Sequence, residues 1–127
     1  MFRLAQVAGK GRGLLATQAI PVGTLIERAP AVRLASAERE VIDRTALFPY
    51  TFADPETFGS GSHGCLIVFG QLTFCNHSES PNAVIRWTED EAGLWALLES
   101  VSAIANGEEI TLFYTNISEY LSTDLFI

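Results

Sequence analysis

The stretch that organises this sequence reads Phe74-Cys75-Asn76-His77-Ser78-Glu79-Ser80-Pro81-Asn82. It follows the apolar run 66–69 and precedes the alternating run 83–87, and both patterns are typical of β-strands. A polar segment between two strands must find hydrogen-bond partners for its side-chain amides and main-chain groups, or it destabilises the fold. Asn, Ser and Pro are also common turn formers, so an ordinary structured turn is the alternative interpretation of this stretch alone.

The composition predicts a single domain over residues 1–127, because the chain has 127 residues and 48% of them are hydrophobic. No apolar run is long enough to span a membrane, and no signal peptide is evident. The cysteines Cys65 and Cys75 suggest neither a disulfide framework nor a four-ligand zinc site, and we expect no metal. We therefore expect a soluble protein in a reducing compartment, cytoplasmic or, in a eukaryote, nuclear.

The formal net charge is −7 at pH 7. Direct nucleic-acid binding needs clustered Lys and Arg, so the charge argues against it. An acidic surface can attract a basic peptide or protein. The alternative is that the negative charge only aids solubility.

The pattern of elements is mostly β, with many short strands and little helix. A short helix is expected from Ser36, as N-cap, to about residue 44. Loops are expected at 54–64 and, as a hairpin connection, at 88–93. Strands are expected at 2–7, 14–16, 24–26, 65–69, 83–87, 94–101 and 109–113.

Two further stretches stand out on either side of the central one. The first is Gly9-Lys10-Gly11-Arg12-Gly13-Leu14-Leu15-Ala16, followed by a turn and strand at 20–26. Its glycines permit close backbone approach to a ligand, although a plain turn between strands is the alternative. The second is Ile104-Ala105-Asn106-Gly107-Glu108-Glu109-Ile110-Thr111-Leu112-Phe113-Tyr114. Its tyrosine either packs at the end of a strand or aims its hydroxyl into a pocket.

Together the three stretches resemble, in order and spacing, the opening, central and closing motifs of the SET domain, a family of compact lysine methyltransferases. The resemblance covers nearly the whole chain, and in size it is similar to the minimal viral and bacterial members without a zinc-binding post-SET module. It implies a mainly β, SET-domain fold of the β-clip type. Small curved sheets then surround a C-terminal pseudoknot, in which the chain near Tyr114 threads beside Asn76 and His77.

The resemblance also implies an activity: an S-adenosyl-L-methionine-dependent protein-lysine N-methyltransferase that produces S-adenosyl-L-homocysteine. Its partner would be a basic, histone-like protein or peptide carrying the target lysine. Cofactor and substrate would enter opposite faces and meet in a narrow channel. The alternatives are a catalytically inactive SET-type binding module and a methyltransferase acting on a non-protein amine.

By resemblance, the main chain of Lys10, Gly11 and Arg12 contributes to the cofactor loop. Asn76 binds the amino-acid end of the cofactor, and His77 contacts the adenine through its main chain. We therefore expect a structural role for the His77 side chain. The remaining assignments are Tyr114 as the catalytic tyrosine, Tyr120 as an aromatic residue over the adenine, and Tyr50, Phe52 and Phe113 as the lining of the substrate channel.

Some of these residues have a second interpretation or a second role. An aromatic core strand is the alternative for Tyr50 and Phe52. Asn76 and Asn82 are also expected to help lock the pseudoknot. Adjacent strand residues point to opposite faces, so Glu108 and Glu109 are not expected to form a carboxylate dyad.

The C-terminal part departs from the family pattern. The segment from Tyr114 to Tyr120 is slightly lengthened, and Glu119 stands where a second channel aromatic is usual. The last residues, Leu125-Phe126-Ile127, are apolar and are expected to pack against a second subunit, as a possible homodimer, or over the substrate groove.

Overall fold

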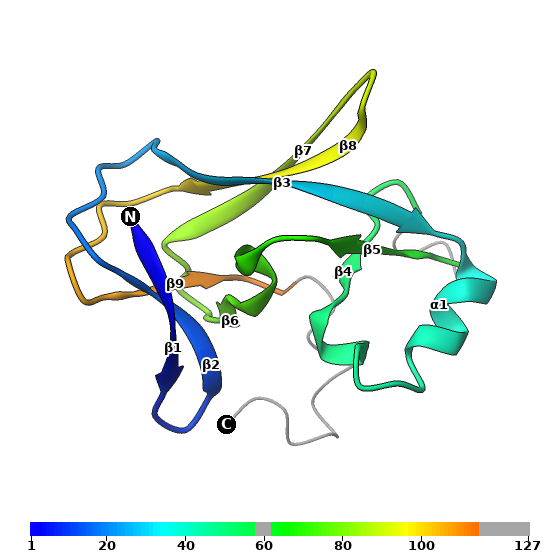
Figure 1. Ribbon diagram of the computed structural model, residues 1–127, viewed down its shortest axis with the longest axis horizontal. Coiled ribbons are helices and arrows are strands. Elements are labelled where there is room, and N and C mark those ends of the chain that lie inside the picture. The colour runs from blue at the N-terminus through cyan, green and yellow to red at the C-terminus, as the bar shows by residue number, and fades with distance from the viewer. Residues whose placement is uncertain (58–61, 115–127) are drawn as a thin grey trace.

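The computed structural model describes residues 1–57 and 62–114. This part of the chain is mainly β-structure, as the sequence predicts, with short helices between the strands (Figure 1). The strands are β1 (Phe2–Val7), β2 (Gly11–Ala16), β3 (Leu25–Leu34), β4 (Phe52–Ala53), β5 (Cys65–Val68), β6 (Asn76–His77), β7 (Ala83–Asp90), β8 (Gly93–Ser100) and β9 (Glu109–Leu112). The helices are α1 (Ser36–Ile42) and the 3-10 helices η1 (Phe48–Tyr50) and η2 (Gln71–Phe74).

The strands form two sheets. The first has the order β1-β2-β9-β6, and the second has the order β4-β5-β3-β8-β7. The long strand β3 pairs with both β5 and β8 and so forms the middle of the second sheet. In Figure 1 the β1–β2 hairpin and helix α1 lie toward opposite ends of the molecule, and the segment from β5 to β6 runs between them.

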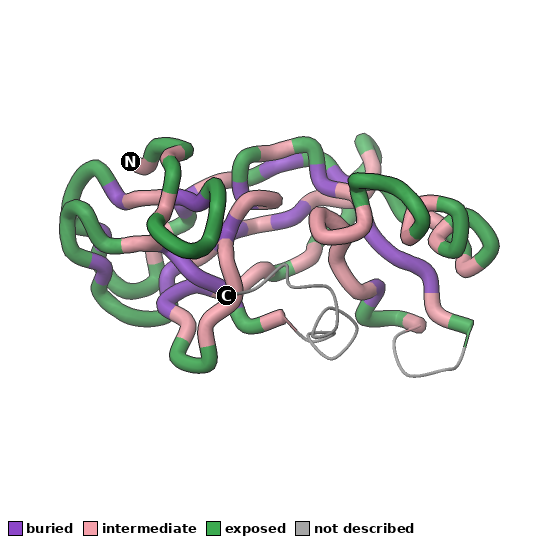
Figure 2. Tube along the Cα trace, turned by 90° about the horizontal axis from the view of Figure 1, so that it is seen from below, coloured by how far each residue is buried: buried purple, intermediate pink, exposed green. Residues whose placement is uncertain are grey.

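One hydrophobic core joins the two sheets. Leu14 of β2, Leu98 of β8 and Ile110 of β9 have no exposed surface and belong to the same cluster. Leu72 of η2 is equally buried, so the helix that precedes the polar stretch is anchored in this core. Full burial of such a side chain stabilises the fold by about 1.5–3 kcal/mol. Figure 2 shows the buried residues along the interior strands and the exposed ones mainly in the peripheral loops.

The two-residue strand β6 pairs in parallel with β9. Asn76 lies opposite Thr111 and His77 lies opposite Leu112. The pairing is continued by Ser78, whose main-chain N–H donates to the Leu112 carbonyl at 2.8 Å. The chain just before Tyr114 therefore runs beside the Asn76-His77 segment, as the sequence resemblance predicts.

Asn82 holds β9 from the other end of the polar stretch. Its Oδ1 accepts the Thr111 main-chain N–H at 2.9 Å, and its Nδ2 donates to the Glu109 carbonyl at 2.8 Å. The side chain acts as a main-chain mimic beside a strand, at a residue that is only 7% exposed. These contacts bear out the expectation that Asn82 ties the two chain segments together.

The start of helix α1 differs from the prediction. Ala35, not Ser36, is the N-cap, and the capping contact comes from the Glu38 carboxylate, which accepts the Ala35 main-chain N–H at 3.0 Å. The Glu38 carboxylate reaches back one turn to the main chain of the N-cap residue and also complements the helix dipole, whereas Ala35 supplies no side-chain cap of its own.

The β7–β8 hairpin is tighter than the predicted loop 88–93. The strands extend to Asp90 and Gly93, which pair with each other. Asp90 Oδ1 accepts the Ala92 main-chain N–H and the Trp95 indole N–H, both at 2.9 Å, and Gly93 adopts a φ of 114°. A carboxylate that closes its own turn lets the strands continue through residues whose charge alone suggested a loop.

No helix in the described ranges is long and apolar enough to cross a membrane. Within the same ranges, no group of three or more His, Cys, Asp or Glu side chains is arranged to hold a metal ion.

Replacing Asn82 with Ala is expected to lower the free energy of unfolding by about 1–3 kcal/mol, because buried main-chain groups of β9 lose their partners. Urea denaturation measures the difference. Asn106→Ala, the same substitution in an exposed turn, is the matched control. Equal stability of the two variants would contradict the role assigned to Asn82.

Candidate active site

A cavity of about 190 Å³ lies where the glycine-rich turn, helices η1 and η2, strand β6 and the end of β9 meet. Many of its lining residues are those that the sequence singles out. The lining residues are Lys10, Gly11, Arg12, Pro49, Tyr50, Thr73, Phe74, Asn76 and Tyr114. The fold thus brings together residues from the beginning, middle and end of the described chain.

The turn between β1 and β2 supplies one wall of the cavity. Its glycines Gly9 and Gly11 have φ values of 75° and 79°, a region that other residues rarely adopt. The Lys10 main-chain N–H donates to the Val7 carbonyl at 3.0 Å and closes the turn. This conformation places the backbone from Lys10 to Arg12 at the cavity wall.

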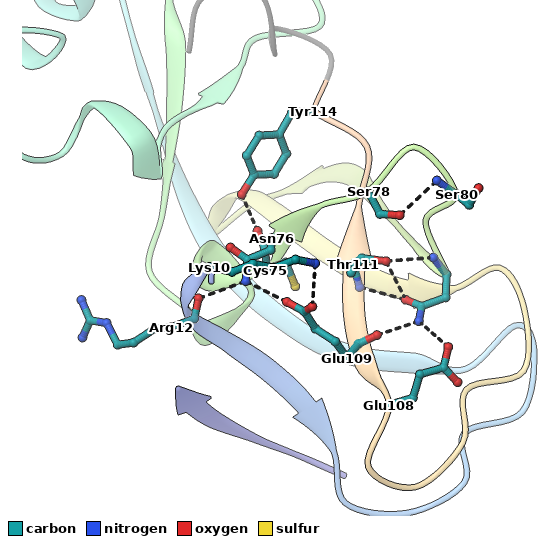
Figure 3. A network of polar contacts seen from close by, with 11 residues as sticks. Lys10, Arg12, Cys75, Asn76, Ser78, Ser80, Glu108, Glu109, Thr111 and Tyr114 are labelled. Atoms are coloured by element: carbon teal, nitrogen blue, oxygen red, sulfur yellow. Dashed lines mark hydrogen bonds and ion pairs between the residues drawn. The ribbon is translucent and has the colours of Figure 1, made fainter. Parts of the chain in front are cut away.

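Asn76 is fixed by a polar network at the base of this turn (Figure 3). Its Nδ2 donates to the Glu109 Oε2 at 2.7 Å and to the Arg12 carbonyl at 3.2 Å. The other carboxylate oxygen of Glu109 pairs with the Lys10 Nζ at 3.1 Å. Because both hydrogens of the Asn76 amide are directed to these acceptors, its orientation is defined and its Oδ1 is left to accept from elsewhere.

Gly13 of β2 provides the space that this network needs. A Cβ at this position would lie 2.7 Å from Asn76 Nδ2 and 2.8 Å from Glu109 Oε2, closer than non-bonded atoms can approach. Val7 Cγ2 would lie 2.9 Å away, so a larger residue here would force side chains from three other strands to shift: Asn76 of β6, Glu109 of β9 and Val7 of β1.

Aromatic rings form another part of the cavity lining. The ring centroids of Tyr50 and Phe74 are 5.2 Å apart in a tilted arrangement. The Arg12 guanidinium lies over the Phe74 ring, 4.4 Å from its centroid, which is a favourable cation–π geometry. Tyr50 ends a 3-10 helix, so the predicted aromatic segment around Pro49 is not a continuous strand.

Tyr114 is held at two points. Its hydroxyl donates a hydrogen bond to the Cys75 carbonyl (Figure 3). Its main-chain N–H donates to His77 Nδ1 at 2.9 Å. The Cys75 thiol itself is only 1% exposed, and its burial raises its pKa well above the usual value, so it is no candidate nucleophile.

Among the predicted residues in the described part of the chain, Phe52, His77 and Phe113 do not line this cavity. Phe52 packs edge-on against Trp87, with centroids 5.8 Å apart. Phe113 is half exposed, and the centroids of its ring and the His77 ring are 5.0 Å apart. It lines a separate, mostly apolar groove of about 320 Å³ that also includes Trp87. Tyr120 and the terminal apolar residues 125–127 lie outside the described residues, so their assignments stay predictions.

The contacts of Glu109 in the site are not apparent from the sequence. Its position next to Glu108 suggests only an acidic pair, and the two carboxylates bind different groups. Glu108 accepts the Ala105 main-chain N–H at 2.9 Å and contacts the Asn82 amide, whereas Glu109 faces Lys10 and Asn76. Strand alternation predicts that the two side chains lie on different faces, but it does not predict which of them meets Lys10 and Asn76.

The comparison with known proteins agrees with this geometry. The model of the SET domain family matches residues 11–115, so the chain belongs to the SET-domain family. The enzyme class predicted from the sequence, protein-lysine N-methyltransferase, is confirmed with it.

A relative from Schizosaccharomyces pombe, histone-lysine N-methyltransferase, H3 lysine-37 specific, is 28% identical over 106 residues. The match covers 83% of this chain and 67% of the relative. The fold is similar to that of a Plasmodium falciparum protein described as a candidate histone methyltransferase, with a TM-score of 0.69, 18% identity and coverage of 91% of this chain and 93% of that chain. It is also similar to that of the Neurospora SET domain protein DIM-5, a histone lysine methyltransferase, with a TM-score of 0.67 and 22% identity. This match covers 91% of this chain and 52% of that chain.

The variant Gly13→Ala is expected to displace the Asn76 amide and to destabilise the protein by about 1–3 kcal/mol, as overpacked sites usually do. A crystal structure of the variant together with thermal denaturation tests this. Gly9→Ala is the comparison, since open space surrounds that position and only its backbone conformation is strained. An unmoved Asn76 in Gly13→Ala would show that the clearance is not required.

Proposed function

We propose that the protein transfers a methyl group from S-adenosyl-L-methionine to the side-chain amine of a lysine in a basic protein, and that the cavity beside Asn76 and Tyr114 holds the methyl donor. The observation that carries this proposal is the convergence of a glycine-rich turn, an oriented amide and an anchored phenol on one cavity.

The residues present fit such a ligand. The turn offers main-chain groups from Lys10 to Arg12, and Asn76 offers a fixed amide beside them for the amino-acid end. The rings of Tyr50 and Phe74 suit a cation, because aromatic faces attract positive charge. S-adenosylmethionine, when bound, supplies a methyl group on a positively charged sulfur. In this proposal the main chain of His77 contacts the adenine, and Tyr120 covers it.

Tyr114 orients the acceptor amine. Its hydroxyl proton is donated to the Cys75 carbonyl, and a phenol oxygen that donates in this way can also accept a hydrogen bond from an amine. A neutral amine must be held with its lone pair toward the methyl group, and positioning of this kind can account for a large part of a rate enhancement. The hydroxyl is fixed before the substrate arrives, so little reorganisation is needed.

The substrate approaches from the side of Phe113. Consecutive residues of an extended chain point in opposite directions, so Tyr114 lines the cavity while Phe113 lines the apolar groove with Trp87. Phe52 supports this side by packing on Trp87. An apolar groove suits the methylene stem of a lysine, and the net charge of −7 favours a basic polypeptide. The histone substrates named for the relatives are consistent with that class, and with a nuclear or cytoplasmic location.

The variant Tyr114→Phe is expected to lower kcat by about 10²-fold while leaving the fold and cofactor affinity nearly unchanged, because the lost contact matters mainly at the transition state. The assay combines labelled S-adenosylmethionine with a panel of basic proteins, and mass spectrometry maps the methylated site. Wild-type kcat and product distribution in the variant would show that Tyr114 is not the catalytic tyrosine, and Tyr50 would be tested next. Absence of methylation of any protein by the wild type, with tight cofactor binding, would favour an inactive binding module or a non-protein amine substrate.

The variant Asn76→Ala is expected to weaken S-adenosylhomocysteine binding by about 1–3 kcal/mol, because a desolvated polar group of the ligand loses its partner. Calorimetric titration measures the affinity, and circular dichroism checks that the variant is folded. Glu108→Ala is a suitable control, because it removes a carboxylate next to Glu109 from a residue that does not line the cavity. Unchanged affinity in Asn76→Ala would place the cofactor elsewhere.

A further inference from the structure

The side chain of His77 has a partner that its sequence context does not suggest. Strand β9 ends at Leu112, and the last main-chain bond between the paired segments is donated by Ser78 to the Leu112 carbonyl. The N–H of Tyr114 lies beyond that ladder. It donates instead to His77 Nδ1 at 2.9 Å, so an imidazole nitrogen takes the place of a strand carbonyl.

This contact defines the protonation of the ring. A nitrogen that accepts an N–H hydrogen bond must carry a free lone pair, so Nδ1 is unprotonated and the neutral ring carries its hydrogen on Nε2. While it holds Tyr114, Nδ1 is not available as a base for a substrate amine. The ring is further confined by Phe113 and Tyr114, whose centroids lie 5.0 Å and 5.4 Å from its own.

Tyr114 is therefore fixed at both ends by neighbours of Asn76. Cys75 holds the hydroxyl through its carbonyl, and His77 holds the main chain through its side chain. Loss of the hydroxyl contact alone would leave the ring in place, whereas loss of the main-chain contact would let the whole residue shift. A small displacement of a reacting or orienting group can cost about 10²-fold in rate.

We propose that the His77 side chain is a positioning residue for methyl transfer, acting through its Nδ1 as the acceptor that places Tyr114. This inference rests on the proposed function of Tyr114, but the contact itself can be tested without catalysis. It gives the His77 side chain a role distinct from the main-chain contact to the cofactor.

The chain allows a matched set of variants. In His77→Asn the amide Oδ1 is as many bonds from Cα as the imidazole Nδ1, so an acceptor is retained at the same place. His77→Leu has a similar shape and no acceptor. His77→Gln has an acceptor that is one bond too far from the main chain.

We expect kcat to fall about 10–10²-fold in His77→Leu and His77→Gln. In His77→Asn we expect a kcat about tenfold higher than in those two variants. The KM for S-adenosylmethionine and the calorimetric affinity for S-adenosylhomocysteine should change less than about threefold. Hydrogen exchange of the Tyr114 amide, measured by NMR, should be slow in the wild type and in His77→Asn and about tenfold or more faster in His77→Leu.

Two results would overturn the inference. One is a wild-type ¹⁵N spectrum in which His77 Nδ1 is protonated at neutral pH, a measurement that needs no variant to fold. The other is equal kcat or equal Tyr114 amide exchange in the folded His77→Asn and His77→Leu proteins, since ring packing rather than the acceptor would then matter. If the wild type transfers no methyl group, the proposed function fails, while the spectrum and the amide exchange still decide whether His77 positions Tyr114.

Discussion

The parallel pairing of β6 with β9 is the constraint on which the rest of the site depends. A strand of two residues cannot stabilise itself, so its position must be imposed by the segments on either side. Before it, η2 is anchored by Leu72 in the core and by Glu27, whose carboxylate accepts the Leu72 main-chain N–H at 2.7 Å. After it, Asn82 bonds the main chain of β9 on both sides of Ile110. The central motif is thus held to the closing strand by contacts from elements far apart in the sequence.

Once β6 is in register with β9, its two residues contact different partners. Alternation along a strand sends the Asn76 side chain toward the glycine turn and Glu109, and the His77 side chain toward Phe113 and Tyr114. A slip of one residue would exchange these faces and lose both sets of contacts. The order of residues in the motif is therefore explained by register, because each neighbour has its own partner on β9 or beyond it.

Much of the fold could be predicted from the sequence because it is encoded locally. Alternating and apolar runs located the main strands, and the glycines marked the turn at Lys10 to Arg12. Contacts between side chains that are far apart in the sequence could not be predicted. Nothing near Glu109 indicates that it meets Asn76 and Lys10, and nothing near Gly13 indicates that a Cβ there would strike both Asn76 and Glu109. Likewise the charged run before Gly93 suggested a loop, because a carboxylate that closes its own turn has the same sequence signature as one that is only solvated.

The same contacts also set the charge of the cavity. The methyl donor in the proposed function is a cation, and like charges at close range repel, so it would be best accommodated where the protein's own cations already have partners. Lys10 is paired with Glu109, and the Arg12 guanidinium lies over the Phe74 ring, so both cations of the cavity lining have a partner within the protein. The Lys10–Glu109 pair adds little to stability, because Lys10 is 35% exposed and such pairs contribute about 0–1 kcal/mol. Its importance lies in the Glu109 carboxylate, which offsets the charge of Lys10 and orients the Asn76 amide, in space that the missing side chain of Gly13 leaves open.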